Sequence, residues 1–320
     1  MKERQKRRTR LLDAGQRSGI ALLLAALLLA GGRIGAAAAE QEEAHDGARS
    51  AAAETQTEAL RSASAEGRAR DTVTTVYLDG REILVGDCVI RDSITYVPLR
   101  KFCNLFANCQ FSWNGKTKTA TVTAEGLTMT VQEGAVYITA NGHVYYTVGE
   151  VINKNGSLYV PIRPLARTMN LTLSWNAGRR CVELSEEGRK SAFVSWANYN
   201  KDDLYWLSRI ISAESRGEPI EGQIAVGNVV LNRVRSRSYP NTIYGVIFDR
   251  KHGTQFSPVS FGTIYNPPAA SSILAAKMCL EGYTLSEDIL FFMNPRIATN
   301  SWISKNRPYA FTIGNHDFYR

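Results

Sequence analysis

The chain has 320 residues, of which 44% are hydrophobic, so it is long enough for two globular domains with buried cores. Its formal charge of +8 is concentrated in residues 1–39, where eight basic and two acidic side chains give +6 and leave +2 for the rest. A nearly neutral body lacks the basic footprint of nucleic-acid-binding proteins, and we expect no nucleic-acid partner.

Residues 1–39 have the three-part pattern of a secretory signal peptide. A basic head is followed by an apolar run at 19–30, which is shorter than the roughly 20 residues that a membrane span needs. Four alanines at 36–39 then supply small residues for cleavage. We therefore expect an exported, extracytoplasmic protein whose membrane contact is limited to this segment. The alternative is an uncleaved N-terminal anchor.

The next two segments differ sharply in composition. Residues 40–72 are rich in Ala, Glu, Arg, Ser and Thr and have no aromatic side chain, which is typical of a flexible linker. Residues 73–186 instead alternate Val, Thr and Tyr with polar residues, as strands do. Turn signals of the Asx-Gly type separate these strands, at 79–80, 114–115, 141–142 and 155–156.

An internal repeat runs through residues 73–186. Tyr-Val-Pro-Leu-Arg at 96–100 recurs 63 positions later as Tyr-Val-Pro-Ile-Arg, and Ser-Trp-Asn at 112–114 recurs 62 positions later. Each copy predicts a strand, a helix that starts at the proline, and a hairpin around the Trp-Asn turn. We expect Trp113 and Trp175 to anchor small cores; the alternative is that their rings stack on glycans.

This block resembles the copper amine oxidase N-terminal-like domain, and we call residues 73–186 the stalk module. The resemblance rests on the repeated Tyr-Val-Pro-(Leu/Ile)-Arg and Ser-Trp-Asn segments, and it implies a stalk of an exported bacterial protein. The block has a single histidine, His143, and no cluster of copper ligands, so we expect no metal and no cofactor.

Five cysteines are present, and their spacing contains no C-x-x-C and no zinc template. Cys103 and Cys109 are the nearest candidate pair for a disulfide in an exported protein. For most of the cysteines the expected role is that of a small buried apolar side chain.

A helical pattern begins after a short connector at residues 187–202, with Asp202 or Asp203 as the expected N-cap. Glu214 continues the spacing of the apolar residues and stands at the end of the helix, before a Gly/Pro break. A partly buried carboxyl group in such a place has a raised pKa and can protonate a leaving group. The structural alternative is an ion pair with Arg216 or Arg233.

The region around Glu214 resembles the SleB-type cell wall hydrolases, the family that includes spore cortex-lytic enzymes. The resemblance covers residues 203–320, which we call the hydrolase domain. It rests on ordered segments: Ala-Glu-Ser-Arg-Gly-Glu-Pro at 213–219, Glu-Gly-Gln-Ile-Ala-Val at 221–226, Val-Leu-Asn-Arg-Val at 230–234, Gln-Phe-Ser at 255–257, Phe-Phe-Met-Asn-Pro at 291–295, and Thr-Ile-Gly-Asn-His-Asp-Phe-Tyr at 312–319.

The resemblance implies a mostly α, lysozyme-like catalytic domain that cleaves the glycan strands of peptidoglycan. The whole chain is then an α+β two-domain protein, in which a repeated stalk module of strands and short helices precedes this domain. Its expected place is the cell wall or the spore cortex. The sequence lacks the helical peptidoglycan-binding domain familiar in cortex-lytic enzymes, which leaves cortex and vegetative wall both open as substrates. The oligomeric state is also open.

Glu214 is the expected catalytic residue, and a set of neutral residues is expected to bind substrate. Gln255, Phe256 and Ser257 follow a turn and are expected to form one wall of a cleft, with Asn294 on the opposite side. The alternatives are a core position for the phenylalanine ring and a turn-forming role for Asn294.

The sequence favours lytic transglycosylation because no second carboxylate has an obvious role beside Glu214. Glu218 and Glu221 have structural explanations in the break and in the first turn of the next helix. The alternatives are muramidase-type hydrolysis, with Asp249 or Asp317 holding a water, and a catalytically silent protein that only binds the wall. His316, a lone histidine, is expected to be structural.

Overall fold

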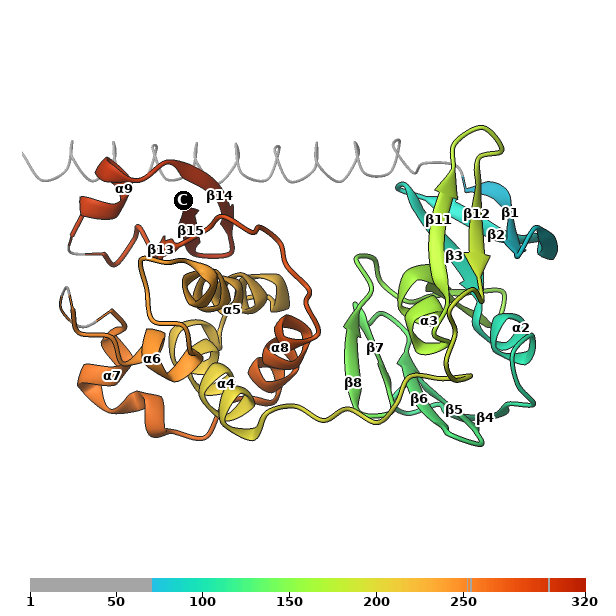
Figure 1. Ribbon diagram of the computed structural model, residues 1–320, viewed down its shortest axis with the longest axis horizontal. Helices are drawn as coiled ribbons and strands as arrows, with labels where there is room; N and C mark the ends of the chain where they lie inside the picture. The colour runs from blue at the N-terminus through green and yellow to red at the C-terminus, as the bar shows by residue number, and fades with distance from the viewer. Residues whose placement is uncertain (1–70, 252, 254, 299) are drawn as a thin grey trace, which may run out of the picture. The chain divides into compact units, whose positions relative to one another are not determined.

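The computed structural model describes residues 71–251, 253, 255–298 and 300–320 (Figure 1). The expected signal peptide and nearly all of the expected linker lie outside these residues. Within the described part, no helix has the length and apolar character needed to cross a membrane. Two regions of different architecture follow one another along the described chain, the first rich in strands and the second rich in helices.

The internal repeat is present as two copies of a strand, a short helix and a hairpin. Pro98 and Pro161 are the N-caps of the two helices, which therefore begin one position after the predicted start at the proline. The first copy consists of β3 (Ile94–Pro98), α2 (Leu99–Asn104), β4 (Gln110–Asn114) and β5 (Thr119–Ala124). The second consists of β10 (Ser157–Pro161), α3 (Ile162–Thr168), β11 (Thr172–Asn176) and β12 (Cys181–Ser185).

The two copies meet through strands β3 and β10, which pair antiparallel in one sheet. Val97 lies opposite Val160, its own counterpart in the other copy. On one side of this valine pair Tyr96 lies opposite Pro161, and on the other side Pro98 lies opposite Tyr159. Both flanking pairs thus join the tyrosine of one copy to the proline of the other. The repeat therefore has a local two-fold symmetry centred on the valine pair.

The hairpins of the two copies belong to different sheets. A seven-stranded sheet has the order β11-β12-β1-β2-β3-β10-β9, in which only β1 and β12 run parallel. A five-stranded antiparallel meander has the order β4-β5-β6-β7-β8. The strands not yet named are β1 (Thr72–Leu78), β2 (Arg81–Arg91), β6 (Leu127–Gln132), β7 (Tyr137–Ala140), β8 (His143–Tyr146) and β9 (Ile152–Lys154).

The core of the stalk module lies between the sheets and the two short helices. Phe102 of α2 and Leu165 of α3 are fully buried in it. All five cysteines of the chain are buried as free thiols, which agrees with the expected role of small buried apolar side chains. The candidate pair Cys103 and Cys109 does not form a disulfide. The Cys109 thiol instead donates to the carbonyl oxygen of Cys103 at 3.7 Å.

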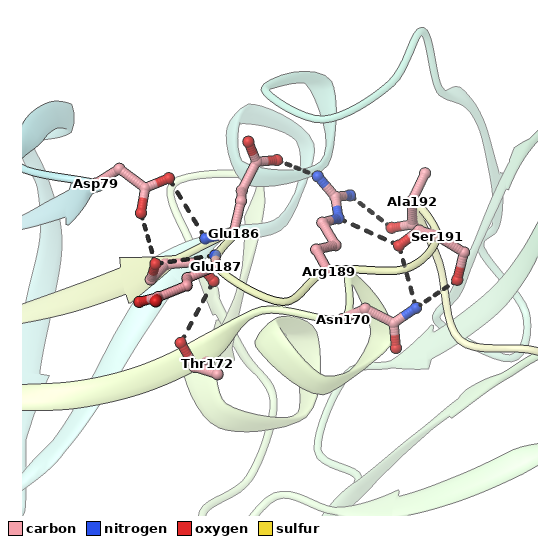
Figure 2. A network of polar contacts seen from close by, with 9 residues as sticks. Asp79, Asn170, Thr172, Glu186, Glu187, Arg189, Ser191 and Ala192 are labelled. Atoms are coloured by element: carbon pink, nitrogen blue, oxygen red, sulfur yellow. Dashed lines mark hydrogen bonds and ion pairs between the residues drawn. The ribbon is translucent and has the colours of Figure 1, made fainter.

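Polar contacts hold the segment after β12 against the stalk module (Figure 2). Arg189 donates to the carbonyl oxygen of Ser191 at 3.2 Å, and Asn170 donates to the Ser191 hydroxyl at 2.9 Å. Phe193 is then buried in the core of the module. The first half of the expected connector at 187–202 is therefore packed on the stalk module.

The second region contains helices and a small sheet of three strands. Its helices are α4 (Lys201–Ser215), α5 (Ile220–Arg235), α6 (Ile243–Ile247), α7 (Ser257–Phe261), the 3₁₀ helix η1 (Thr263–Tyr265), α8 (Ala270–Leu280) and α9 (Trp302–Asn306). Its strands are β13 (Phe291–Met293), β14 (Tyr309–Ile313) and β15 (His316–Tyr319), in the order β13-β15-β14. The sequence analysis did not anticipate this sheet, which is formed largely by the last two sequence segments that carry the resemblance, at 291–295 and 312–319.

Helix α4 begins two to three residues earlier than the sequence analysis placed it. Its N-cap is Asn200, whose side-chain oxygen accepts from the backbone N–H groups of Asp202 and Asp203 at 2.9 and 3.1 Å. The two aspartates lie in the first turn instead, where negative charge interacts favourably with the helix dipole. The correction arises because asparagine is as good an N-cap as aspartate.

Helices α4, α5 and α8 pack closely around the core of the hydrolase domain. Gly227 of α5 permits this approach, because a Cβ atom there would lie 2.7 Å from the Cys279 sulfur and 2.9 Å from Cδ1 of Ile211. Helix α5 therefore lies against α4 and α8 at once, and it fixes the end of α4 that carries Glu214.

Candidate active site

Glu214 lies in the last turn of α4, immediately before the chain breaks and restarts at Pro219, the N-cap of α5. It follows the buried residues Leu207, Ile210 and Ile211 on the same side of the helix. The carboxyl side chain is partly buried, whereas the residues just beyond the helix, Arg216 and Gly217, are exposed. The local pattern thus places an acid at the edge of the apolar core.

Burial raises the pKa of Glu214 to about 7, and the positive charge of Arg233 acts in the opposite direction. Among the described residues Glu214 makes no ion pair, so the expected structural alternative of a salt bridge to Arg216 or Arg233 is not found. A carboxyl group with a pKa near neutrality is protonated often enough to act as an acid, and it remains basic enough to take the proton back.

Arg233 is the charged residue whose field lowers the pKa of Glu214. Its side chain is 5% exposed, its Nε donates to the carbonyl oxygen of Leu290 at 2.8 Å, and its Nη1 has no partner among the described residues. Burial lowers the pKa of Arg233, while the charges of Tyr239, Asp249 and Glu214 act to raise it. The structure therefore brings Asp249 and Glu214 into the field of one buried guanidinium.

Aromatic rings surround the Arg233 guanidinium. Its carbon lies 5.2 Å from the ring centre of Phe256 and 5.5 Å from that of Phe291. These contacts bring the segment before α7 and the strand β13 together beside α5. The sequence analysis considered Arg233 only as an ion-pair partner; its place in an otherwise apolar helix next to Asn232 was the signal available.

Amide side chains of α5 fix the surrounding loops. Asn228 and Asn232 donate at 3.0 Å to carbonyl oxygens in the loop 283–290. Gln223, which is 2% exposed, donates to the carbonyl oxygen of Glu218 at 3.0 Å. These buried hydrogen bonds explain why amides stand on the inner face of this helix, since an unpaired buried amide would be strongly unfavourable.

Glu218 is held by the turn between β14 and β15. Its two oxygens accept from the backbone N–H and the side-chain amide of Asn315 at 2.9 and 3.1 Å. Burial by itself raises the pKa of Glu218, but these hydrogen bonds and the charge of His316 together outweigh it and lower the pKa. Gly314 has φ +59°, and a Cβ there would overlap the Glu218 carboxylate. Glu218 is thus an ionised structural residue.

The other acids that the sequence analysis weighed are also engaged. Glu221 accepts a hydrogen bond from the Tyr146 hydroxyl at 2.8 Å. Asp317 accepts from Thr312 at 2.6 Å within the hairpin. Asp249 accepts from the backbone N–H of Lys251 at 2.9 Å and is only partly buried.

The three residues expected to form a cleft wall have different environments. Phe256 is 3% exposed and packs in the core, with its ring 6.4 Å from that of Phe292. This placement corrects the expectation that the ring packs on a sugar, because protein atoms enclose it. Gln255 is partly exposed and donates to the carbonyl oxygen of Gly253 at 3.2 Å. Ser257 is exposed at the start of α7.

Asn294 follows β13 and forms a turn. Its side-chain oxygen accepts from the backbone N–H of Arg296 at 3.0 Å, and its carbonyl oxygen accepts from Ala298 at 3.0 Å. The side chain is partly exposed. Among residues 71–320 that are described, no group of three or more His, Cys, Asp or Glu side chains is arranged to hold a metal ion.

Comparison with known proteins assigns both regions. Residues 217–319 match the family described as Cell Wall Hydrolase, and residues 77–184 match the copper amine oxidase N-terminal domain. The chain carries a cell wall hydrolase domain. Glu214 lies three positions before the first residue matched to that family, in the helix that leads into it.

Relatives of the hydrolase domain include the spore cortex-lytic enzymes of Bacillus cereus and Bacillus subtilis, which are 39% and 38% identical over 120 residues. Each match covers 38% of this chain, and it covers 45% of the B. cereus enzyme and 38% of the B. subtilis enzyme. The chain thus spans less than half the length of these relatives.

A solved structure is also similar, the catalytic domain of the germination-specific lytic transglycosylase SleB of Bacillus anthracis. It is 38% identical, and the match covers 38% of this chain and 98% of that one, with a TM-score of 0.35.

Proposed function

We propose that this protein cleaves the glycan strands of peptidoglycan between N-acetylmuramic acid and N-acetylglucosamine, with Glu214 as the catalytic acid. The observation that carries the proposal is the partly buried Glu214 carboxyl group at a helix end, with a pKa of about 7 and no ion-pair partner among the described residues. The similarity of the hydrolase domain to spore cortex-lytic enzymes supports the substrate.

The reaction that we propose is lytic transglycosylation. Glu214 donates its proton to the glycosidic oxygen, and the bond from that oxygen to C1 of the muramic acid breaks. The Glu214 carboxylate then takes the proton of the C6 hydroxyl of the same sugar, whose oxygen bonds to C1. The product has a 1,6-anhydro end, and no water is consumed. A pKa near neutrality suits a group that is acid first and base second.

Arg233 has a supporting part in this cycle. The ionised Glu214 carboxylate exists between the two proton transfers, when it is no longer neutral in its apolar surroundings. The buried Arg233 charge favours that ionised form, as its opposing effect on the Glu214 pKa indicates. We propose that Gln255, Ser257 and Asn294 contact the sugar through their exposed polar atoms, and we leave the enclosed Phe256 ring out of this set.

The overall arrangement that we propose for the hydrolase domain is lysozyme-like. Helices carry the acid, and the small sheet of β13, β14 and β15 borders the same region through the contacts of Arg233 and Glu218. The proposed location is outside the cytoplasm, in the spore cortex or the cell wall. The relatives described as spore cortex-lytic enzymes support that location.

Replacement of Glu214 tests the proposed acid. We expect Glu214→Gln to abolish most release of soluble muropeptides from purified peptidoglycan, because glutamine has nearly the same shape but cannot donate an acidic proton. Glu287→Gln is the matched control, since Glu287 is exposed and far from α4 in sequence. Glu214→Gln activity within a few-fold of the unchanged protein would contradict the assignment.

Hydrolysis is the second candidate, and one observation favours it. The charges of Asp249 and Glu214 both act on the buried Arg233, and in this second candidate Asp249 is the carboxylate proposed to hold the attacking water. The products separate the two reactions. We expect 1,6-anhydromuramic ends, which borohydride leaves unchanged. Predominant muramic ends that borohydride reduces would show hydrolysis, and Asp249→Asn would then be expected to abolish it.

A further inference from the structure

Each copy of the repeat in the stalk module borders a surface cavity. The first cavity has a volume of about 470 Å³ and is lined by Pro98, Arg100 and Trp113, among others. The second has a volume of about 220 Å³ and is lined by the equivalent residues Pro161, Arg163 and Trp175. The two cavities therefore arise from the same sequence positions, 62 or 63 residues apart.

The tryptophans of both cavities are exposed. Trp113 is 51% exposed and Trp175 is 47% exposed, so the expectation that they anchor small cores is wrong. Each stands in the first strand of a hairpin at the edge of its sheet, β4 or β11, where the side chain points away from the core. The same large, half-exposed apolar ring therefore lines a cavity in both copies, where it is accessible to a ligand.

An arginine accompanies each tryptophan. Arg100 and Arg163 are exposed at the starts of α2 and α3, and among the described residues neither forms an ion pair. The two lysines that line the first cavity, Lys101 and Lys154, are paired with aspartates at 2.6 and 3.1 Å. The arginines are thus the positive charges that remain available for a ligand.

We propose that these two cavities are paired binding sites for the glycan strands of peptidoglycan, separate from the catalytic site. In each cavity the C–H face of a sugar ring lies on the indole, and the arginine binds a carboxylate of the peptide that muramic acid carries. Indole faces suit sugar rings, and guanidinium groups suit carboxylates through paired hydrogen bonds. The inference rests on peptidoglycan being the substrate of the hydrolase domain.

The two cavities differ in ways that predict different affinities for the glycan strand. In the first cavity the Arg100 guanidinium lies 4.2 Å above the ring centre of Phe111, which orients it toward the cavity. In the second cavity the equivalent residue is Leu173, which offers no such contact. The first cavity is also the larger, so we expect it to bind more tightly.

Two weak sites on one rigid module suit a polymer with many repeated units. When one site binds a strand, the second meets the same network at a high effective concentration, and the two together hold far better than either alone. The stalk module would in this way retain the enzyme on an insoluble wall while leaving Glu214 free to act.

Binding to purified sacculi tests the proposal. The measurements use the full chain with Glu214→Gln, so that the sacculi stay intact, and follow the protein that sediments with them. We expect Trp113→Ala and Trp175→Ala each to weaken binding by about threefold to tenfold. The double variant is expected to weaken it by about 100-fold, because both sites are then impaired and neither can hold the strand while the other rebinds. Trp196→Ala is the control, since Trp196 is 64% exposed but lines neither cavity.

Two further measurements complete the test. In the full chain with Glu214→Gln, we expect Arg100→Gln and Arg163→Gln together to weaken binding to normal sacculi. Amidation of the carboxylates of the sacculi is expected to weaken binding of the chain with both arginines to the same extent. With Glu214 present, the double tryptophan variant is expected to cleave soluble glycan at the normal rate, which separates this inference from the catalytic proposal. Undiminished binding by the double variant, or an equal loss with Trp196→Ala, would overturn the inference. Full binding of amidated sacculi would overturn the role of the arginines.

Discussion

Glu214 and Glu218 show how neighbouring carboxyl groups acquire opposite properties. They are four residues apart, yet the pKa of Glu214 is raised to about 7 and the pKa of Glu218 is lowered. Burial raises the pKa of both, but only Glu218 receives two hydrogen bonds, both from Asn315. Hydrogen-bond donors stabilise a carboxylate, whereas an apolar wall without donors stabilises the neutral acid.

The raised pKa of Glu214 predicts a stability gain from its removal. The folded pKa of about 7 lies above the unfolded value of 4.5, so ionisation of Glu214 opposes folding as the pH rises from 4.5 to 7. We expect Glu214→Gln to be more stable than the unchanged protein by about 3 kcal/mol at pH 8, and equally stable at pH 4. Denaturant unfolding at both pH values measures this. A difference that does not depend on pH would contradict it.

The same pKa predicts how catalysis depends on pH. Glu214 must be protonated to act, so we expect the rate of glycan cleavage to fall as the pH rises through about 7. Arg233→Met removes the charge that favours the ionised form, and the falling limb of the profile should then move to higher pH. A profile that stays in place with Arg233→Met would show that Arg233 does not act on Glu214.

Sequence reasoning predicted the position of Glu214 because it depends on local helical spacing. It gave the burial of Phe256 only as an alternative, because a short Gln-Phe-Ser segment has no periodicity that distinguishes an enclosed ring from an exposed one. It also missed the part of Arg233, whose neighbours come from α4, the segment before α7, and β13, and meet only in the folded chain.

At the scale of elements, the hairpin of β14 and β15 is joined to the break between α4 and α5 by a single carboxylate. The turn of the hairpin presents Gly314 and Asn315 to Glu218, and a Cβ atom at position 314 would overlap the Glu218 carboxylate. The last strand, β15, also pairs with β13, which follows the loop held by α5. The C-terminal hairpin therefore helps to fix the loops around the candidate site.

Loss of this carboxylate is expected to destabilise the hydrolase domain. Glu218→Ala removes two hydrogen bonds to a charged acceptor, and we expect the free energy of unfolding to fall by about 1 to 3 kcal/mol at pH 7. Because the folded pKa of Glu218 is lowered, its contribution is present above the unfolded pKa and is lost as the pH falls through the folded value. The variant and the unchanged protein should therefore converge in acid. Unfolding at pH 7 and pH 3 checks this, and equal stability at pH 7 would refute it.

The elements of each repeat could be predicted, but their sheets could not. A strand, a helix after proline and a hairpin follow from local signals, and the structure confirms all three in both copies. The first hairpin begins the five-stranded meander, while the second joins the seven-stranded sheet through the parallel pairing of β12 with β1. Pairing between distant strands depends on burial and neighbours rather than on local propensity.

At the scale of the whole molecule, the stalk module makes contacts beyond its own core. The Tyr146 ring stacks on Tyr283 with centres 4.3 Å apart, and its hydroxyl donates to Glu221. Val144 is buried with the apolar residues of the hydrolase domain. The catalytic part and the proposed retaining part of the chain therefore also contact each other directly, through β8 and the residues of the hydrolase domain that it meets.

A fragment of residues 190–320 separates catalysis from retention. We expect it to cleave soluble glycan at a rate close to that of the whole chain, because Glu214 and its surroundings lie within it. It should melt at a lower temperature, since it loses the contacts of Val144 and Tyr146, and it should not sediment with sacculi. Tyr146→Phe in the whole chain isolates the lost hydrogen bond. A fragment that folds but does not cleave would contradict the division of labour.

The self-symmetric pairing of β3 with β10 has a consequence for the origin of the stalk module. Because Val97 faces its own counterpart and the flanking pairs exchange, the contact has the form of an isologous interface between two identical subunits. An ancestor with a single copy would have used this strand edge to dimerise. Duplication and fusion of its gene would then have made the dimer permanent within one polypeptide, after which the two hairpins were free to diverge.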